Sequence, residues 1–186
     1  YLADVELKDY KSAIDRLCEE EPKVEKRMML EGTMSSGEKD LAVNDIVLTR
    51  EGNLRIVQFN VYVNGTLLNT YQADGVIICT PTGSTGYNLS AGGPVLDACA
   101  AVMVLTPVCA HSIHAVPLVF SASRTLTVVA EATNRDSVYA SADSHSRCDL
   151  QPGESLTITT AVEQLGLITF DETEQFRAIE TKLMRR

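Results

Sequence analysis

Residues 57–72 read VQFNVYVNGTLLNTYQ, and this stretch predicts the fold class of the chain. Apolar residues occupy every second position from Val57 to Val63, which is the period of a β-strand with one wet face. Asn64-Gly65 follows at once and favours a two-residue turn, because both turn residues need a positive φ. Thr66 to Gln72 returns as the partner strand. The stretch therefore predicts a β-hairpin with one buried face.

Short apolar or alternating runs extend over most of the chain on both sides of this hairpin. Further strands are expected over residues 26–34, 41–48, 76–80, 101–106, 118–120, 125–130, 137–142, 155–160 and 165–170. Their spacing of roughly 8–12 residues is typical of an antiparallel sandwich and not of alternating βα units. The expected fold class is mainly β, a two-sheet, mostly antiparallel β-sandwich-like domain that occupies residues 1–186.

Helices are expected near each end of the chain. Glu6 to Glu20 carries apolar residues at helical spacing, with acids and lysines on the other face. A second helix should follow Asp171, and its apolar positions are Phe176, Ile179 and Leu183. A weaker helical pattern runs from Tyr87 to Cys99 and is interrupted by glycine and proline.

Composition narrows the classes of partner. The 186 residues contain 16 basic and 25 acidic side chains, a net charge of −9. An acidic chain is a poor generic binder of nucleic acid or anionic membrane. The sequence contains no run of about 18 apolar residues, so no membrane span is predicted. The five cysteines are odd in number and form no Cys-x-x-Cys pair, which favours a reducing compartment such as the cytoplasm.

The densest candidate site lies in residues 74–94, which read DGVIICTPTGSTGYNLSAGGP. An apolar strand runs into a loop rich in glycine and hydroxyl side chains, and Tyr87 offers a flat face for a base. The loop contains neither a Walker A sequence nor a Gly-x-Gly-x-x-Gly fingerprint. A nucleotide-type site and an ordinary glycine-rich turn are both compatible with this pattern.

Three further polar groups have alternative interpretations. Asn44-Asp45 interrupts an apolar strand; the pair could grip two ribose hydroxyls, or it could mark a β-bulge or a turn. His111 and His114 lie between strands without an evident third ligand, so structural histidines are favoured over a metal site. Asp143 and His145 follow a strand and could contact a ligand or form a solvated turn.

Taken together, these motifs resemble the NAD kinase family over nearly the whole chain. The resemblance rests on RMMLE at 27–31, AVNDIV at 42–47, Asp74-Gly75, residues 80–94, Thr106-Pro107, His111-Ser112 and Pro117-Leu118. It implies transfer of the γ-phosphoryl group of ATP, or in some members polyphosphate, to the 2′-hydroxyl of the adenosine ribose of NAD, giving NADP. It also implies Mg²⁺ with the phosphoryl donor, and cytoplasmic homodimers or homotetramers.

The resemblance also assigns roles to residues of this chain. Asn44 and Asp45 would bind the adenosine ribose hydroxyls. The adenine would be held by Thr85, Gly86 and Tyr87. Asp74 and Ser90 would reach the nicotinamide side, across a subunit boundary in an oligomer.

The chain departs from the family pattern in three places. Gly86 stands where many members have Ala, and Asp143-Ser144-His145 stands where many have Asp-Gly-Gln. The family's Gly-Gly-Asp-Gly motif, which supplies the catalytic acid, is absent from the sequence. We therefore expect the carboxyl-terminal, NAD-binding half of the enzyme, cut from a longer protein whose amino-terminal α/β half is missing. No catalytic residue and no metal ligand is assigned here, and the chain alone should be inactive.

Two other functions stay open on the sequence. One is a lipid kinase of the same superfold, of the diacylglycerol or sphingosine type; Asn44-Asp45 and Tyr87 do not favour it. The other is a non-catalytic β-sandwich binding module, which would have no affinity for nucleotides.

Overall fold

The computed structural model describes residues 5, 7–52, 56–112, 114–134, 137–170 and 179–180. The chain begins with a short 3₁₀ helix, η1 (Leu7–Asp9), and helix α1 (Tyr10–Glu19), and two further short helices, η2 (Thr82–Thr85) and α2 (Tyr87–Ser90), lie in its middle. The strands are β1 (Lys23–Met34), β2 (Lys39–Ala42), β3 (Asp45–Arg50), β4 (Val57–Val63), β5 (Thr66–Ala73), β6 (Gly75–Cys79), β7 (Val102–Val108), β8 (Leu118–Ser121), β9 (Leu126–Ala130), β10 (Val138–Ala142), β11 (Cys148–Leu150) and β12 (Ser155–Thr169).

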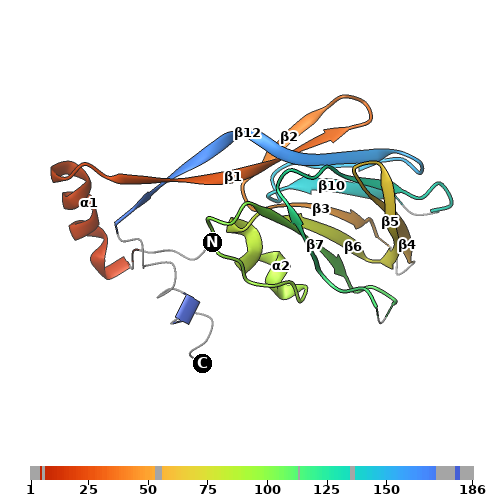
Figure 1. Cartoon of the computed structure of the whole chain (residues 1–186), viewed down its shortest axis with the longest axis horizontal. Coiled ribbons are helices and arrows are strands. Elements are labelled where there is room, and N and C mark those ends of the chain that lie inside the picture. Colours follow the sequence, from red (N-terminus) through yellow and green to blue (C-terminus); the bar gives the residue numbers. More distant parts are fainter. Residues whose placement is uncertain are drawn as a thin grey trace.

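These strands form two sheets that pack face to face (Figure 1). Sheet A has the order β2-β1-β12-β9-β4-β5, and sheet B has the order β11-β10-β3-β6-β7-β8. Every pairing between neighbouring strands is antiparallel. The expected mainly β, two-sheet sandwich is therefore confirmed.

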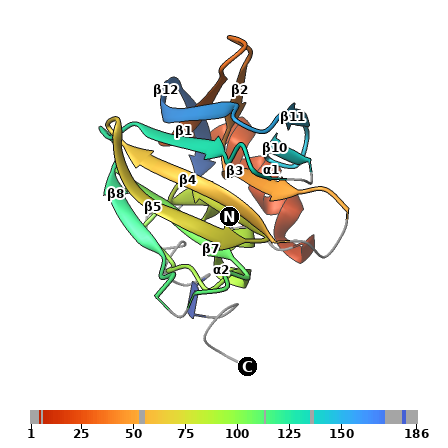
Figure 2. The ribbon, with the colours of Figure 1, turned by 90° about the vertical axis from the view of Figure 1, so that its right-hand side faces the viewer.

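The core of the sandwich is built from the alternating positions that the sequence marks as apolar. Phe59 and Val61 of β4 are fully buried, and they pack in one cluster with Ile78 of β6 and Leu105 of β7. The hairpin of β4 and β5 turns at Asn64 and Gly65, whose φ values of 49° and 80° are the positive values that this turn requires. Figure 2 shows this hairpin nearest the viewer, in front of the strands of sheet B.

A second, smaller apolar cluster covers the outer face of sheet B. Val47, Ile77, Cys79 and Val104 form it, and Ala91 and Leu96 from the segment after α2 pack against it. Strand β6 is therefore buried on both faces, which explains why residues 75–79 are apolar without alternation. The covering segment begins with the glycine-rich loop, so this cluster fixes the loop against the sheet.

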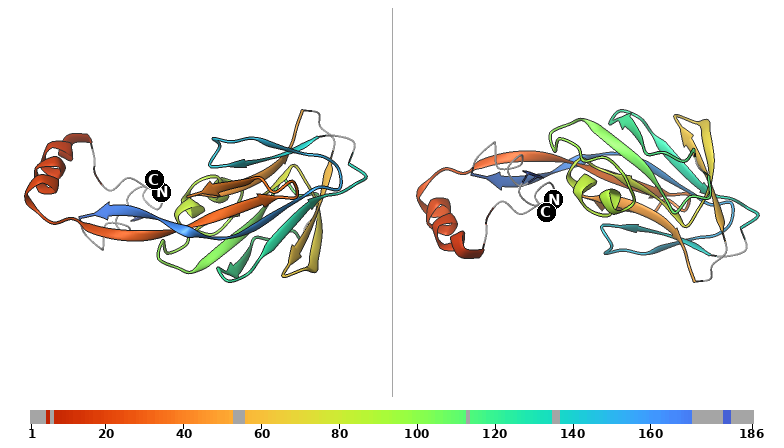
Figure 3. Two further views of the ribbon diagram at one scale, coloured as in Figure 1. Left: turned by 90° about the horizontal axis from the view of Figure 1, so that it is seen from above. Right: turned by 90° about the horizontal axis from the view of Figure 1, so that it is seen from below.

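Strands β1 and β12 continue beyond the sandwich as a two-stranded ribbon, and α1 lies at its far end (Figures 1 and 3). The expected amino-terminal helix is confirmed, although none of its residues is buried. Its Arg16 guanidinium lies 4.5 Å from the centre of the Phe170 ring, at the end of the ribbon. The expected carboxyl-terminal helix falls outside the described residues except at Ile179 and Glu180, which are helical.

Several element boundaries differ from those expected. The strand expected over residues 41–48 is two strands, β2 in sheet A and β3 in sheet B, separated by a corner. The helix expected from Tyr87 to Cys99 ends at Ser90, where a turn leads into an irregular segment with Gly92 at φ 88°. The strands expected over 155–160 and 165–170 are one strand, β12, and β11 was not expected.

All five cysteines are free thiols. Within the part of the chain that the structure describes, no helix is long and apolar enough to cross a membrane.

Candidate functional site

The corner between β2 and β3 is the centre of the site, because it presents Asn44 and Asp45 at the end of sheet B. Its backbone is tied to the end of β6 by Thr80, whose hydroxyl donates to the Val43 carbonyl at 2.6 Å. The backbone N–H of Thr80 donates to the Asn44 carbonyl at 2.8 Å. The interruption of the apolar strand is thus a passage from one sheet to the other, so that of the two structural alternatives it is a turn and not a β-bulge.

The same corner is held from its other side by Asp143, in the turn between β10 and β11. The Asp143 carboxylate accepts hydrogen bonds from the backbone N–H groups of Val43, Asn44 and Asp45, at 2.7, 2.8 and 3.1 Å. Asp143 and Ser144 have φ values of 47° and 60°, so this turn is a tight left-handed one. Asp143 is half-buried, Ser144 and His145 are exposed, and the turn lies at the surface as one of the two interpretations expects, but the Asp143 carboxylate serves to hold the corner in place.

Asp45 differs sharply from Asp143 in its surroundings. Its side chain lies on the outer face of sheet B, the residue is only 7% exposed, and its carboxylate accepts no hydrogen bond from the described residues. Burial, and next the negative charge of Asp143, raise the pKa of Asp45 to about 6. A desolvated carboxylate without a donor is suited to accept hydrogen bonds from a ligand.

The glycine-rich loop lies directly against this corner. A Cβ atom at Gly83 would stand 2.1 Å from the Asn44 carbonyl oxygen, so only glycine permits the approach. The Gly83 N–H donates to the Thr80 hydroxyl at 3.1 Å, which links loop, corner and strand end. The two motifs that the sequence separates by about forty residues are therefore one contiguous surface.

A buried amide holds the rest of the loop in place. Asn88 is fully buried and donates to the carbonyls of Ser84 and Pro94, at 3.0 and 2.9 Å. It accepts a hydrogen bond from the Thr106 hydroxyl at 2.6 Å. A Cβ atom at Gly93 would stand 2.0 Å from the Asn88 side-chain oxygen, so Gly93 is required for this contact. The network supports the loop from beneath and leaves no donor of the Asn88 amide for a ligand.

Four expected contact residues of the loop are, by contrast, accessible. Gly86, Tyr87 and Ser90 are exposed and Thr85 is half-buried. Burial and then the negative charges of Cys109, Asp74, Tyr139 and Asp45 raise the pKa of the Tyr87 hydroxyl.

Asp74 is separated from the other expected residues. It precedes β6 at Gly75, whereas Asp45 pairs with Cys79 at the other end of that strand, a separation of about 13 Å along the strand. Its carboxylate forms an ion pair with Arg50, with 2.8 Å between Nε and Oδ1. The structure thus brings Asn44, Asp45 and the loop together, and it sets Asp74 at the opposite end of β6.

The structure adds functional-site residues that sequence reasoning missed. Gly83, Asn88 and Gly93 belong to the quoted loop, but nothing in the pattern separates these supporting residues from those that face solvent. His111 and His114 are exposed, and the described residues contain no group of three His, Cys, Asp or Glu side chains that could hold a metal ion.

Known proteins resemble this chain over most of its length. Residues 43–170 match the family model of the ATP-NAD kinase C-terminal domain. The NAD kinase of Lachnospira eligens is 36% identical over 175 residues, which cover 86% of this chain and 60% of that protein. The NAD kinase of Lachnoclostridium phytofermentans is 34% identical, with coverage of 98% and 67%. The chain belongs to the NAD kinase family.

Solved structures of NAD kinases share the fold described above. Yeast NADH kinase complexed with NADH superposes with a TM-score of 0.87 at 26% identity, over 96% of this chain and 54% of that one. The NAD kinase of Archaeoglobus fulgidus in complex with ATP gives a TM-score of 0.74 at 24% identity, over 93% and 65%; that likeness concerns the fold alone. The chain spans 60% and 67% of the length of the two bacterial relatives.

Proposed function

We propose that this chain is the dinucleotide-binding half of an enzyme that phosphorylates NAD at the 2′-hydroxyl of its adenosine ribose, with ATP as donor, to give NADP. One observation carries the proposal: the Asn44-Asp45 corner packs directly against the loop that exposes Thr85, Gly86 and Tyr87. A ribose site and a base site are thereby adjacent, as an adenosine requires.

The chemistry of each side chain suits its proposed role. The Asp45 carboxylate can accept from a ribose hydroxyl, and the Asn44 amide can donate to or accept from the other. The Tyr87 ring offers a flat face for adenine. Since a hydrogen bond to a charged acceptor is worth about 1.5–3 kcal/mol, Asp45 would contribute a substantial part of the binding energy.

In this proposal, the phosphoryl donor and its Mg²⁺ are bound mainly by residues outside this chain. The described residues offer no group of three metal ligands, and the chain has a net charge of −9 that opposes binding of free ATP. The proposal therefore gives this chain the task of holding the acceptor hydroxyl in position, and leaves the charge of the transferred phosphoryl group to other parts of a longer cytoplasmic protein.

We assign Asp74 and Ser90 to a site that is shared between two copies of the chain. Asp74 lies about 13 Å along β6 from the corner, and its side chain is 35% exposed. It would complete the nicotinamide end of a site in a neighbouring chain of a homodimer or homotetramer. Sedimentation as a dimer or larger at tens of micromolar, as an order of magnitude, is expected; a monomer would contradict this role.

Titration calorimetry with NAD tests the site. The chain should bind NAD, and Tyr87→Ala should weaken binding at least about tenfold, which corresponds to about 1.4 kcal/mol. Tyr10→Ala is the matched control, because Tyr10 and Tyr87 are 47% and 46% exposed. Equal affinities of the two variants would contradict a base site at Tyr87.

A thermal-shift screen separates the alternatives. Stabilisation by NAD, NADP or NADH supports the proposal, and NADH is included because the yeast relative was solved with it. Stabilisation by diacylglycerol alone would indicate the lipid kinase. No shift with any nucleotide would indicate a non-catalytic binding module.

A further inference from the structure

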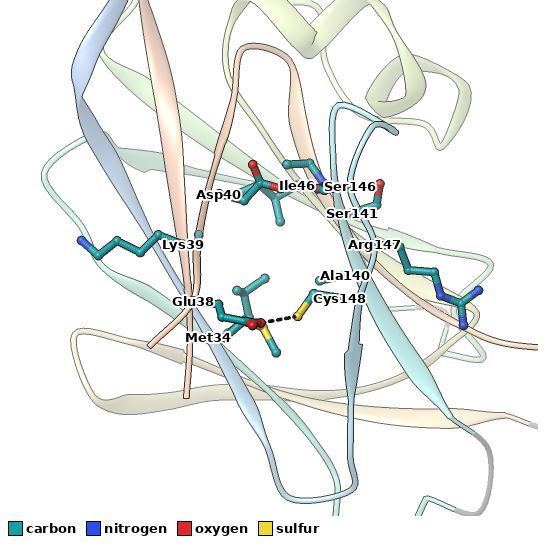
Figure 4. A pocket seen from close by; sticks show the side chains of 13 residues that line it. Met34, Glu38, Lys39, Asp40, Ile46, Ala140, Ser141, Ser146, Arg147 and Cys148 are labelled. Atoms are coloured by element: carbon teal, nitrogen blue, oxygen red, sulfur yellow. Dashed lines mark hydrogen bonds between the residues drawn. The ribbon is translucent and has the colours of Figure 1, made fainter. Parts of the chain in front are cut away.

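A cavity of about 340 Å³ opens between the two sheets at their edges, where β2 borders sheet A and β11 borders sheet B (Figure 4). Its volume is within the range of small-molecule sites. It lies on the core-facing side of sheet B, because it is lined by Ile46 and Ala140, whereas Asp45 and Tyr139 point to the outer face. It is therefore separate from the candidate dinucleotide site.

The inner surface of the cavity is apolar. Its floor is formed by Gly32, Met34, Ile46, Ala140, Ala142 and Leu156. These residues are buried, so a ligand that reached them would remove its own apolar surface from water. The floor thus selects a ligand with an apolar body.

The mouth of the cavity carries an unbalanced negative charge. Glu38 and Asp40 line it, and neither carboxylate forms an ion pair with the described residues. The two cations nearby are engaged elsewhere: Lys39 pairs with Glu31 at 2.8 Å, and Arg147 pairs with both Glu51 and Asp149. Figure 4 shows Lys39 and Arg147 pointing away from the cavity.

We propose that this cavity binds a small organic cation, an ammonium group on an apolar body, with the ammonium between Glu38 and Asp40 and the body on the floor. An anion would meet two carboxylates without a counter-charge, so it is excluded by repulsion. A metal ion at the two carboxylates would complete its shell with water and would leave the apolar floor uncovered. An amphipathic amine satisfies both parts of the cavity.

Cys148 provides a reporter inside the cavity. Its thiol donates to the Glu38 carboxylate at 3.5 Å and points into the hollow (Figure 4). A bound ligand would cover it and slow its alkylation. Cys18 and Cys109 are exposed and lie outside the lining, so they serve as internal references in the same sample.

The experiment titrates the chain with phenethylamine and follows iodoacetamide labelling of each cysteine by peptide mass spectrometry. Phenethyl alcohol and phenylacetate are the neutral and anionic controls. We expect saturable protection of Cys148 by the amine, at least about tenfold more potent than by the alcohol, and none by phenylacetate. Glu38→Gln with Asp40→Asn should abolish that preference. Glu19→Gln with Glu163→Gln, which removes the same charge from exposed positions, should leave it unchanged.

Three results would overturn the proposal. One is the lack of saturable protection by phenethylamine up to about 10 mM. Another is equal protection by the amine and the alcohol, which would make the cavity a plain apolar void. The third is retention of the preference in the Glu38→Gln, Asp40→Asn chain, provided that its thermal unfolding matches that of the wild type. If the proposal holds, the single variant Glu38→Gln, which retains Asp40, should lose only part of the preference for the amine over the alcohol.

Discussion

Replacing Asp45 by Asn should stabilise the folded chain at alkaline pH while it weakens dinucleotide binding. Burial and the neighbouring Asp143 raise the Asp45 pKa from 3.8 to about 6. Each pKa unit corresponds to about 1.4 kcal/mol, so the ionised carboxylate lowers the free energy of unfolding by about 3 kcal/mol at pH 8. An amide of the same shape carries no charge and removes this penalty.

The sign of the pH dependence follows from the direction of the shift. Because the folded pKa lies above the unfolded one, the folded state binds the proton more tightly, and the wild type loses stability as pH rises through about 6. Below pH 4 the acid is protonated in the folded chain, and the variant should then resemble the wild type. The stability of Asp45→Asn relative to wild type should therefore increase by about 2 kcal/mol between pH 4 and pH 8.

Urea denaturation of both proteins at several pH values measures this difference. Asp15→Asn, at an exposed position of α1, is the control and should show a difference that does not vary with pH. Calorimetry with NAD at pH 8 supplies the second measurement, in which Asp45→Asn should bind at least about tenfold more weakly. A stability difference independent of pH would refute the electrostatic reasoning, and unchanged NAD affinity would refute the binding role.

Four further predictions concern the corner, the loop and the whole chain. Asp143→Asn should lower the free energy of unfolding by about 2–4 kcal/mol, since three N–H groups lose a charged acceptor; an unchanged urea midpoint would contradict it. Ser144→Gly should raise that free energy by about 1 kcal/mol, because φ is 60° there; a lower melting temperature would contradict it. Gly83→Ala should prevent folding, whereas Gly86→Ala, with φ −94° and its nearest atom at 3.3 Å, should be nearly neutral by circular dichroism. The chain with NAD, ATP and Mg²⁺ should form no NADP in a coupled assay; robust NADP formation would show that this chain alone carries out the phosphoryl transfer.

The parts of the fold that sequence predicted are those that local physics determines. The hairpin at Asn64-Gly65 follows from φ values that few other residue pairs accept, and the alternation of β4 follows from its one buried face. The helix α1 follows from its apolar spacing, although that face remains exposed. In each case the residues involved lie within about twenty positions of one another.

The errors arise where distant residues decide the local structure. The run at 41–48 is predicted as one strand with a polar interruption, but Asp143, about a hundred residues away, holds Val43 and Asn44 in a corner between two strands. The helical pattern after Tyr87 ends early because Asn88 bonds to Pro94 and closes the loop on itself. Local propensity could not reveal either contact, since both depend on the packing of separate elements.

The two neighbouring carboxylates at the corner show how structural and ligand-binding roles can be told apart. Asp143 accepts three backbone hydrogen bonds, so its charge is already compensated within the chain. Asp45 is more deeply buried than Asp143 but its carboxylate accepts none, and the charge of Asp143 adds to the effect of burial on its pKa. A fold would gain stability by replacing such a residue with an apolar one. A ligand hydroxyl that donates to Asp45 would offset the desolvation that the chain itself leaves uncompensated, which is the role proposed for this carboxylate.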